Sequence, residues 1–258
     1  VPWENVAPND DGDWISQRNE EFETFTPIGP SIFRVHSRGV LTARDVWAYD
    51  SSKHALDKKM RSLINVYNDQ VDVEILERNP AAIKWDGTLI TRAQRGESVT
   101  YQPGAVQPAT YRPFFKQHIY FDRALNNSVY QMPKIFAREN LGFYVVGMGS
   151  AVPFSVVASS TLVDVHLTGA GSGGQFFPRY SYEKRVTDEN QLSFEGDDAD
   201  EYTRVDNVTD GILAEYRATY GAASDREVTK DDIFFYVYGL LHSPEYRERF
   251  AADLKKML

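Results

Sequence analysis

The segment that decides the fold, residues 111–123, has the sequence YRPFFKQHIYFDR. It places five aromatic rings and three basic residues in thirteen positions. Pro113 biases the preceding Arg112 towards an extended backbone, and the dense apolar run over residues 118–121 predicts a buried strand. Two interpretations stay open, a core strand with basic ends or a rigid strip of cations that faces an anionic partner.

The composition describes an ordinary globular protein of one large domain or one domain with an appendage. Of its 258 residues, 42% are hydrophobic and 13% aromatic, and no run approaches the roughly 18 apolar residues of a membrane span. The absence of Cys excludes disulfides and thiolate metal sites and is typical of a cytoplasmic protein. Because the chain begins at Val1 without a signal-peptide pattern, we expect a piece of a longer polypeptide.

The net charge of −9 conceals a segregation of charge along the chain. Residues 80–140 carry eight Lys and Arg against four Asp and Glu, whereas the remainder carries twenty against thirty-three. A basic middle in an acidic chain is what a phosphate-binding surface on one face of a protein would produce. The segregated charges are therefore compatible with nucleic acid as a partner, despite the negative net charge.

Helices are predicted near the N-terminus, after about forty loop-rich residues whose aromatic rings we expect to pack. Thr42 is expected to cap a short helix over residues 43–47, and Ser51 or Ser52 to cap a longer one. The longer helix carries one apolar stripe with the basic side chains largely off it, formed by Leu56, Met60, Leu63, Ile64 and Tyr67. This pattern favours a helix that packs on the core over one that faces DNA.

The middle of the chain is predicted to be mainly β, with five or six strands. The apolar runs lie at residues 141–148, 154–158, 162–167 and 175–180, and an acidic, turn-like boundary follows at 188–200. Thr209, Thr229 and Ser243 are expected to begin three helices, the last two of which pair as a hairpin. The predicted fold class is α+β, a mainly β central body with N-terminal helices and a C-terminal helical subdomain.

No catalytic constellation stands out. The glycine-rich residues 169–174 lack the Lys-Ser/Thr ending of a phosphate loop and precede a predicted strand, so we expect a β-connection. Asp164 and His166 share a predicted strand face without a nucleophile elbow. Asp72, Glu74 and Glu183 are the candidate acids for a metal-dependent nuclease, but they are far apart in sequence. The sequence favours recognition over reaction.

Several motifs occur in a characteristic order. They are GDWI at residues 12–15 with Arg18, PIG at 27–29, GVLTARD at 39–45, YRPF at 111–114, YFD at 120–122, PKIF at 133–136, FSV at 154–156 and YGLLHSPEYR at 238–247. Together they make the chain resemble the C-terminal part of single-polypeptide Type I (Type ISP) restriction-modification enzymes, often described as predicted helicases. The resemblance spans nearly the whole chain.

The resemblance implies a target recognition domain in a phage-defence enzyme. In such enzymes a nuclease, a helicase-like translocase and an adenine N6-methyltransferase precede the domain that recognises double-stranded DNA. This sequence has no Asn-Pro-Pro-Tyr methylation motif and no helicase motif. S-adenosylmethionine, ATP and Mg²⁺ are therefore expected only for the upstream domains of a cytoplasmic parent enzyme, and the fragment itself is expected to be non-catalytic.

The domain division follows from the same resemblance. Residues 1–45 are expected to join the upstream methyltransferase domain, 46–186 to form the α/β recognition body, and 187–258 to form an acidic linker and the helical subdomain. Within this division the segment 111–123 becomes mainly a structural spine, and base reading is expected in loops around it, between Lys84 and Gln107.

The candidate DNA-binding residues are Lys84, Arg92, Arg95, Arg112, Lys116 and Arg123. Arg and Lys side chains hold phosphates, and a subset of them reaches base edges. Arg112 and Arg123 are equally able to pair internally with acids such as Asp122, and Trp85 could stack on bases or be buried. Two alternatives stay open, a structural coupling module and a metal-dependent nuclease domain.

Overall fold

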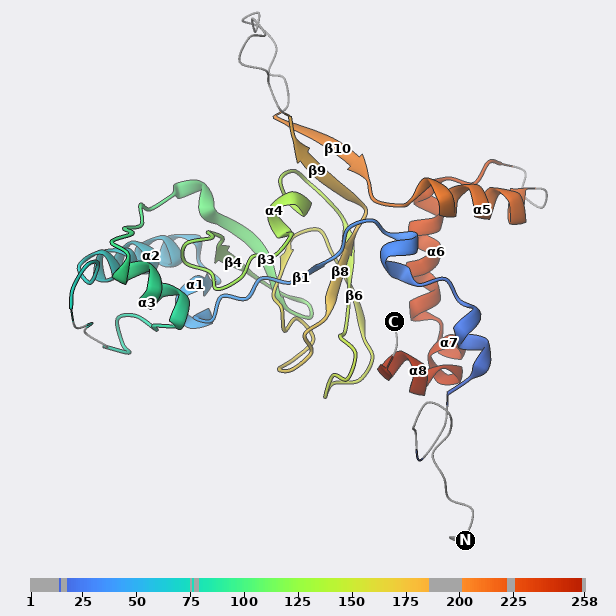
Figure 1. Ribbon diagram of the computed structural model, residues 1–258, viewed down its shortest axis with the longest axis horizontal. Helices are drawn as coiled ribbons and strands as arrows, with labels where there is room; N and C mark the ends of the chain where they lie inside the picture. The colour runs from blue at the N-terminus through green and yellow to red at the C-terminus, as the bar shows by residue number, and fades with distance from the viewer. Residues whose placement is uncertain are drawn as a thin grey trace, which may run out of the picture.

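The computed structural model describes residue 14 and residues 18–74, 76, 79–185, 201–221 and 226–256. Figure 1 shows an elongated molecule with three parts side by side: a lobe with helices α1 to α3, a central β layer, and a group of C-terminal helices. The predicted α+β class is confirmed. Among the described residues, no helix is long and apolar enough to span a membrane.

The first lobe packs its helices on a four-stranded sheet of order β2-β4-β3-β7. Ser52 caps α2 by accepting a hydrogen bond from the Ala55 backbone N–H at 3.2 Å, as predicted. The whole predicted apolar stripe of α2 is buried. The lobe contains α1 (Asp45–Ala48), β2 (Tyr49–Asp50), α2 (Lys53–Asn68), α3 (Gly87–Gln94), the 3₁₀ turn η4 (Pro103–Ala105), β3 (Val106–Arg112), β4 (Phe115–Tyr120) and β7 (Leu162–Val163).

The segment 111–123 forms most of a hairpin rather than one buried strand. β3 ends at Arg112, β4 begins at Phe115, and Phe114 in the turn has a φ of +60°. The Phe114 side chain is 98% exposed, and only the last two residues of β4, Ile119 and Tyr120, are buried. The predicted buried strand is therefore confirmed at Ile119 and Tyr120, whereas the first half of β4 is not buried because it follows directly on a surface turn.

The central layer is an antiparallel sheet of order β1-β8-β5-β6. Gly142 is required in β5, since a Cβ atom there would lie 2.4 Å from the Phe176 ring. A two-stranded ribbon, β9 with β10, projects from this layer (Figure 1). The strands are β1 (Ser37–Arg38), β5 (Gly142–Val145), β6 (Val156–Ser159), β8 (Gln175–Pro178), β9 (Tyr180–Lys184) and β10 (Tyr202–Asp206), with α4 (Met132–Ile135) beside them.

Two local predictions for the first two parts need correction. The strand expected over 162–167 ends at Val163, because the Asp164 carboxylate accepts a hydrogen bond from the His166 backbone N–H at 2.8 Å and turns the chain. Thr42 does not cap α1; the N-cap is Arg44, and the Thr42 hydroxyl contacts the Asp45 carboxylate instead.

The C-terminal helices begin where the sequence predicted. Thr209, Thr229 and Ser243 each accept a hydrogen bond from the first turn of their helix, and Thr229 forms a full capping box with Asp232. The N-terminal turns η2 (Glu20–Thr24) and η3 (Ile28–Ile32) pack on this group through aromatic contacts such as Phe25 with Phe250. The helices are α5 (Asp210–Tyr220), α6 (Lys230–His242), α7 (Pro244–Arg249) and α8 (Ala251–Lys256). The predicted acidic boundary at 188–200 lies outside the described residues.

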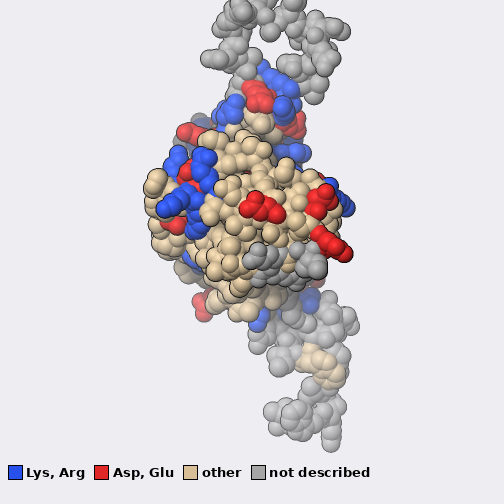
Figure 2. All heavy atoms as spheres, turned by 90° about the vertical axis from the view of Figure 1, so that its left-hand side faces the viewer, with Lys and Arg blue, Asp and Glu red and all other residues tan. Residues whose placement is uncertain are grey.

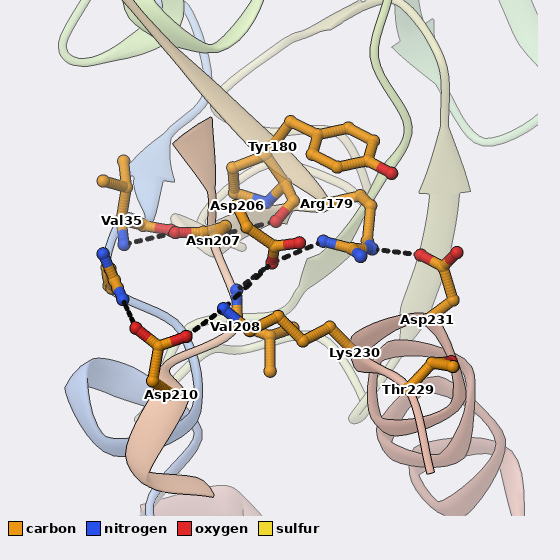
Figure 3. A network of polar contacts seen from close by, with 12 residues as sticks. Val35, Arg179, Tyr180, Asp206, Asn207, Val208, Asp210, Thr229, Lys230 and Asp231 are labelled. Atoms are coloured by element: carbon orange, nitrogen blue, oxygen red, sulfur yellow. Dashed lines mark hydrogen bonds and ion pairs between the residues drawn. The ribbon is translucent and has the colours of Figure 1, made fainter. Parts of the chain in front are cut away.

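A buried arginine joins the ribbon to the C-terminal helices (Figure 3). Arg179, 6% exposed, donates to Asp206 of β10 at 2.7 Å and to Asp231 of α6 at 2.5 Å. Lys230 and Arg34 both pair with Asp210 at the start of α5. Charged contacts therefore attach three elements to one side of the central layer.

Candidate nucleic-acid interface

Helix α3 is the longer of the two α-helices within the basic middle of the chain, residues 80–140. Asp86 caps it by accepting a hydrogen bond from the Leu89 backbone N–H at 2.9 Å, and Gly96, with a φ of +73°, follows its last turn. Leu89 and Ala93, four residues apart, are buried against the α2 side of the lobe. We expected loops between Lys84 and Gln107, although an Asp cap followed by this spacing is a helix signal.

The opposite side of α3 is polar and exposed. Thr88, Thr91 and Arg95 stand at positions i, i+3 and i+7, so they lie along one side of the helix. They line an open depression together with Gly87, Arg92, Glu97 and Asn127. Hydroxyl, amide and guanidinium groups are the types that contact base edges and phosphates in protein–DNA complexes.

The outer end of this lobe is not uniformly basic. Figure 2 shows an end face that is largely uncharged, with basic side chains gathered along one edge, some carboxylates among them, and further carboxylates elsewhere on the face. The segregated charges of the sequence suggested a phosphate-binding surface on one face of the protein, and the basic side chains in this view lie along an edge and do not cover the face.

Three of the six predicted DNA-binding residues lie on or beside α3. Lys84 is exposed just before the helix and Arg95 is exposed at its end. The Arg92 guanidinium is less available to bind DNA, because it donates a hydrogen bond to the Glu97 carboxylate at 2.8 Å. Trp85 is partly buried and its ring lies 5.8 Å from that of Tyr67, so the indole belongs to the core of the lobe.

The other three predicted residues lie apart from this depression. The Arg112 guanidinium pairs with the buried Asp164 at 2.8 Å and lies 3.9 Å from the centre of the Tyr111 ring. Lys116 is exposed on β4 and lines a different pocket, shared with Tyr238 of α6. Arg123 is exposed in the turn after β4.

Asp164 is the centre of a buried polar group between the two sheets. Its carboxylate accepts hydrogen bonds from Arg112 at 2.8 Å and from the Tyr49 hydroxyl at 3.1 Å. Burial raises the pKa of Asp164, and Arg112 opposes that rise. Burial also raises the pKa of Tyr49 well above its usual value, with the Asp164 charge adding to the rise. These contacts brace the hairpin, so Arg112 has the internal role that the sequence left open, with Asp164 as its partner.

The acids considered for a nuclease do not form a site in the described part of the chain. Asp72 and Glu74 are exposed after α2, and Glu183 is exposed on the ribbon. No group of three or more His, Cys, Asp or Glu among the described residues could hold a metal ion.

A protein-family comparison identifies the chain. The model of the Type ISP C-terminal specificity domain matches residues 31–258. The chain belongs to this family. Its role is therefore target recognition in a restriction-modification enzyme, as the order of motifs in the sequence implied.

Solved structures of DNA-bound enzymes share this domain. The chain matches the DrdV–DNA complex with a TM-score of 0.82 and 28% identity over 98% of its length. It matches LlaBIII, an ATP-dependent Type ISP restriction-modification enzyme bound to DNA, with a TM-score of 0.83 and 29% identity over 98% of its length. It matches a nuclease-deletion mutant of the Type ISP restriction-modification enzyme LlaGI, in complex with a DNA substrate mimic, with a TM-score of 0.78 and 30% identity over 100% of its length.

The chain corresponds to only part of each of these enzymes. It covers 25% of the DrdV chain, 16% of the LlaBIII chain and 23% of the LlaGI mutant chain. No curated protein matches the sequence.

Proposed function

We propose that this specificity domain recognises double-stranded DNA with the exposed side of α3. One observation carries the proposal: Thr88, Thr91 and Arg95 lie exposed along one side of a helix whose other side, at Leu89 and Ala93, is buried. A short helix held this way presents its polar side as a rigid unit, and an α-helix fits the major groove of B-DNA.

The side chains around α3 divide between two kinds of contact. Lys84 and Arg95 are exposed cations suited to phosphates, which fix the register of the protein on the duplex. Thr88, Thr91 and Asn127 are neutral and short, and they carry the hydroxyl and amide groups that read base edges. Arg92 would bind DNA only by exchanging its Glu97 contact for a phosphate.

The remaining predicted cations take secondary roles. Lys116 and Arg123, both exposed, are proposed to hold phosphates beyond the α3 depression. Arg112 is proposed to brace the β3–β4 hairpin, since its charge is already compensated by Asp164.

The DNA-bound relatives support DNA as the partner, and their greater length supports further domains in the parent polypeptide. We propose that upstream nuclease, helicase-like and adenine N6-methyltransferase domains act on the site that this domain selects. S-adenosylmethionine, ATP and Mg²⁺ would then serve those domains, and the parent enzyme would act in the cytoplasm.

Charge reversal on α3 tests the proposal. The purified chain is used to select a preferred duplex from a random pool, and its affinity is measured over a range of salt concentrations. The double change Arg92→Glu and Arg95→Glu should weaken binding and lower the salt slope by about 0.9 for each phosphate contact that is lost. The double change Arg204→Glu and Arg217→Glu, at exposed positions on β10 and α5, reverses the same number of charges and is the matched control that should change neither quantity.

Two results would count against the proposal. Binding that does not depend on salt would exclude the phosphate contacts on which it rests. Equal weakening by the α3 variant and the control variant would indicate a general charge effect without an interface at α3. Incubation of the chain with plasmid and Mg²⁺ should leave the plasmid intact, and cleavage would favour the nuclease alternative.

A further inference from the structure

A buried arginine lies directly behind the N-terminus of α3. Arg44 is 1% exposed and reaches the helix from the segment between β1 and α1. Its Nη2 atom donates to the Asp86 carboxylate at 2.6 Å. Its other N–H groups donate to the carbonyl oxygens of Thr42 at 3.1 Å, Lys84 at 3.4 Å and Leu125. One guanidinium therefore holds together three segments that are distant in sequence.

Asp86 makes two contacts at once. Its Oδ1 atom caps α3 through the Leu89 N–H, and its Oδ2 atom accepts from Arg44. The same Oδ2 atom lies 3.5 Å from the Asn127 side-chain nitrogen, which also lies 3.4 Å from the Thr88 hydroxyl. The capping carboxylate is therefore bonded to the interior of the lobe on one side and is next to the polar depression on the other.

Because Arg44 is buried, its ion pair with Asp86 is costly to break. A buried cation needs a charged partner and satisfied N–H groups, and loss of one partner leaves the other uncompensated. Asp86 caps α3 and is also bonded to Arg44 in the interior of the lobe. It has little freedom to move, because any shift of the start of α3 would break the hydrogen bond between Asp86 and Arg44. Within the part of the chain that the structure describes, the Ser52 side chain that caps α2 has no such second attachment.

We propose that Arg44 and Asp86 are positioning residues for target recognition, which fix the direction of α3 and the place of Asn127 relative to the DNA. This inference rests on the proposed function of α3. Neither residue needs to touch DNA. Their loss should reduce discrimination between target and non-target duplexes while leaving the salt-dependent affinity for unrelated DNA in place, since that affinity comes from surface cations.

The test compares three changes at Asp86. Asp86→Glu keeps the charge and two acceptor oxygens for Arg44, Asp86→Ser keeps the cap alone, and Asp86→Ala removes both contacts. The measured quantity is the ratio of affinities for the duplex selected by the wild-type chain and for a scrambled duplex of equal length. We expect the ratio to stay nearest to the wild-type value for Glu, which keeps the charged contact to Arg44, and to fall about tenfold or more for Ser and Ala.

Ser52→Ala is the matched control, because it removes a helix cap from the same lobe without touching α3. It should lower thermal stability but leave the affinity ratio unchanged. If Asp86→Ser does not fold, the double variant Arg44→Met with Asp86→Ser removes the unpaired charge and serves the same comparison. Amide hydrogen exchange should show faster exchange in α3 for the Ser variant than for the Glu variant.

Two outcomes overturn the inference, and they can be told apart. An unchanged ratio for Asp86→Ser, with stability lowered as in Ser52→Ala, would show that the pair only stabilises the fold. If Thr91→Ala and Arg95→Ala leave binding and discrimination unchanged, the proposed α3 interface is wrong, and the positioning role falls with it.

Discussion

At the scale of single residues, burial decides what each cation does. Arg44 and Arg179 are almost completely buried and each is compensated by carboxylates within its surroundings. Arg95, Lys84 and Lys116 are exposed and open to solvent. The sequence presents all of these as equivalent positive charges, because a residue type does not reveal whether tertiary contacts enclose it.

Arg179 gives a stability prediction. Burial alone would lower the pKa of Arg179, but the hydrogen bonds to Asp206 and Asp231 outweigh it and raise that pKa. Arg179→Ala should lower the free energy of unfolding by about 2 kcal/mol, less than for a fully buried pair because the Asp231 side chain is 59% exposed. Denaturant unfolding measures this. Lys184→Ala, which breaks an exposed pair on the same ribbon, should show no measurable loss.

Phe114 gives a second prediction at this scale. Its positive φ is uncommon for a large side chain, and the ring is 98% exposed. Phe114→Gly should therefore raise the free energy of unfolding by about 0.5 kcal/mol, because relief of backbone strain exceeds the added entropy of the unfolded chain. Phe143→Ala, at a fully buried ring, should lower it by about 3 kcal/mol or more. A loss of stability in Phe114→Gly would contradict the reading of this turn.

At the scale of elements, four of the five predicted helix caps are confirmed, and Thr42 is the exception. Ser52, Thr209, Thr229 and Ser243 begin their helices as the sequence predicted, because a cap acts within three residues. The turn between β3 and β4 could not be predicted, since a Pro-Phe pair with a positive φ at Phe114 lacks the Gly or Asn that announces such turns.

The capping box of α6 gives a pH prediction. Hydrogen bonds from Arg226, and then from Thr229, lower the pKa of Asp232 below its ordinary value. A lowered folded-state pKa contributes stability that is present above the unfolded-state pKa and is lost as the pH falls through the folded-state pKa. The wild-type chain should therefore lose more stability than Asp232→Asn as the pH falls below about 4. Parallel pH profiles for the two proteins would contradict this.

At the scale of the whole molecule, the order of motifs predicted the family, while the candidate site was predicted only in part. Lys84, Arg92 and Arg95 come together because one helix and its cap carry them. Arg112 and Lys116 are separated from them by the hairpin, which turns one towards Asp164 and the other towards α6. Sequence clustering of charge could not show this, because the direction of each side chain depends on strand register.

The elongated shape places α3 in the first lobe, at the opposite side of the central layer from the C-terminal helices (Figure 1). Recognition by α3 and attachment to other domains could therefore use different parts of the molecule. Because the contacts of α5 to α8 with the central layer do not involve α3, variants such as Arg179→Ala should lower stability without changing the affinity ratio between target and scrambled duplexes. That ratio, measured below the unfolding temperature, tests the independence of the two regions.

The most direct test of the account is site-directed photocrosslinking to DNA. The chain has no Cys, so Gln94→Cys provides one attachment point for a photoreactive group at an exposed position of α3 outside the proposed base-reading residues, and Thr219→Cys on α5 provides the control. With the duplex selected by the wild-type chain, recognition by α3 predicts efficient crosslinks from position 94, confined to the selected site, and background levels from position 219. Crosslinks from position 219 with none from position 94 would contradict recognition by α3.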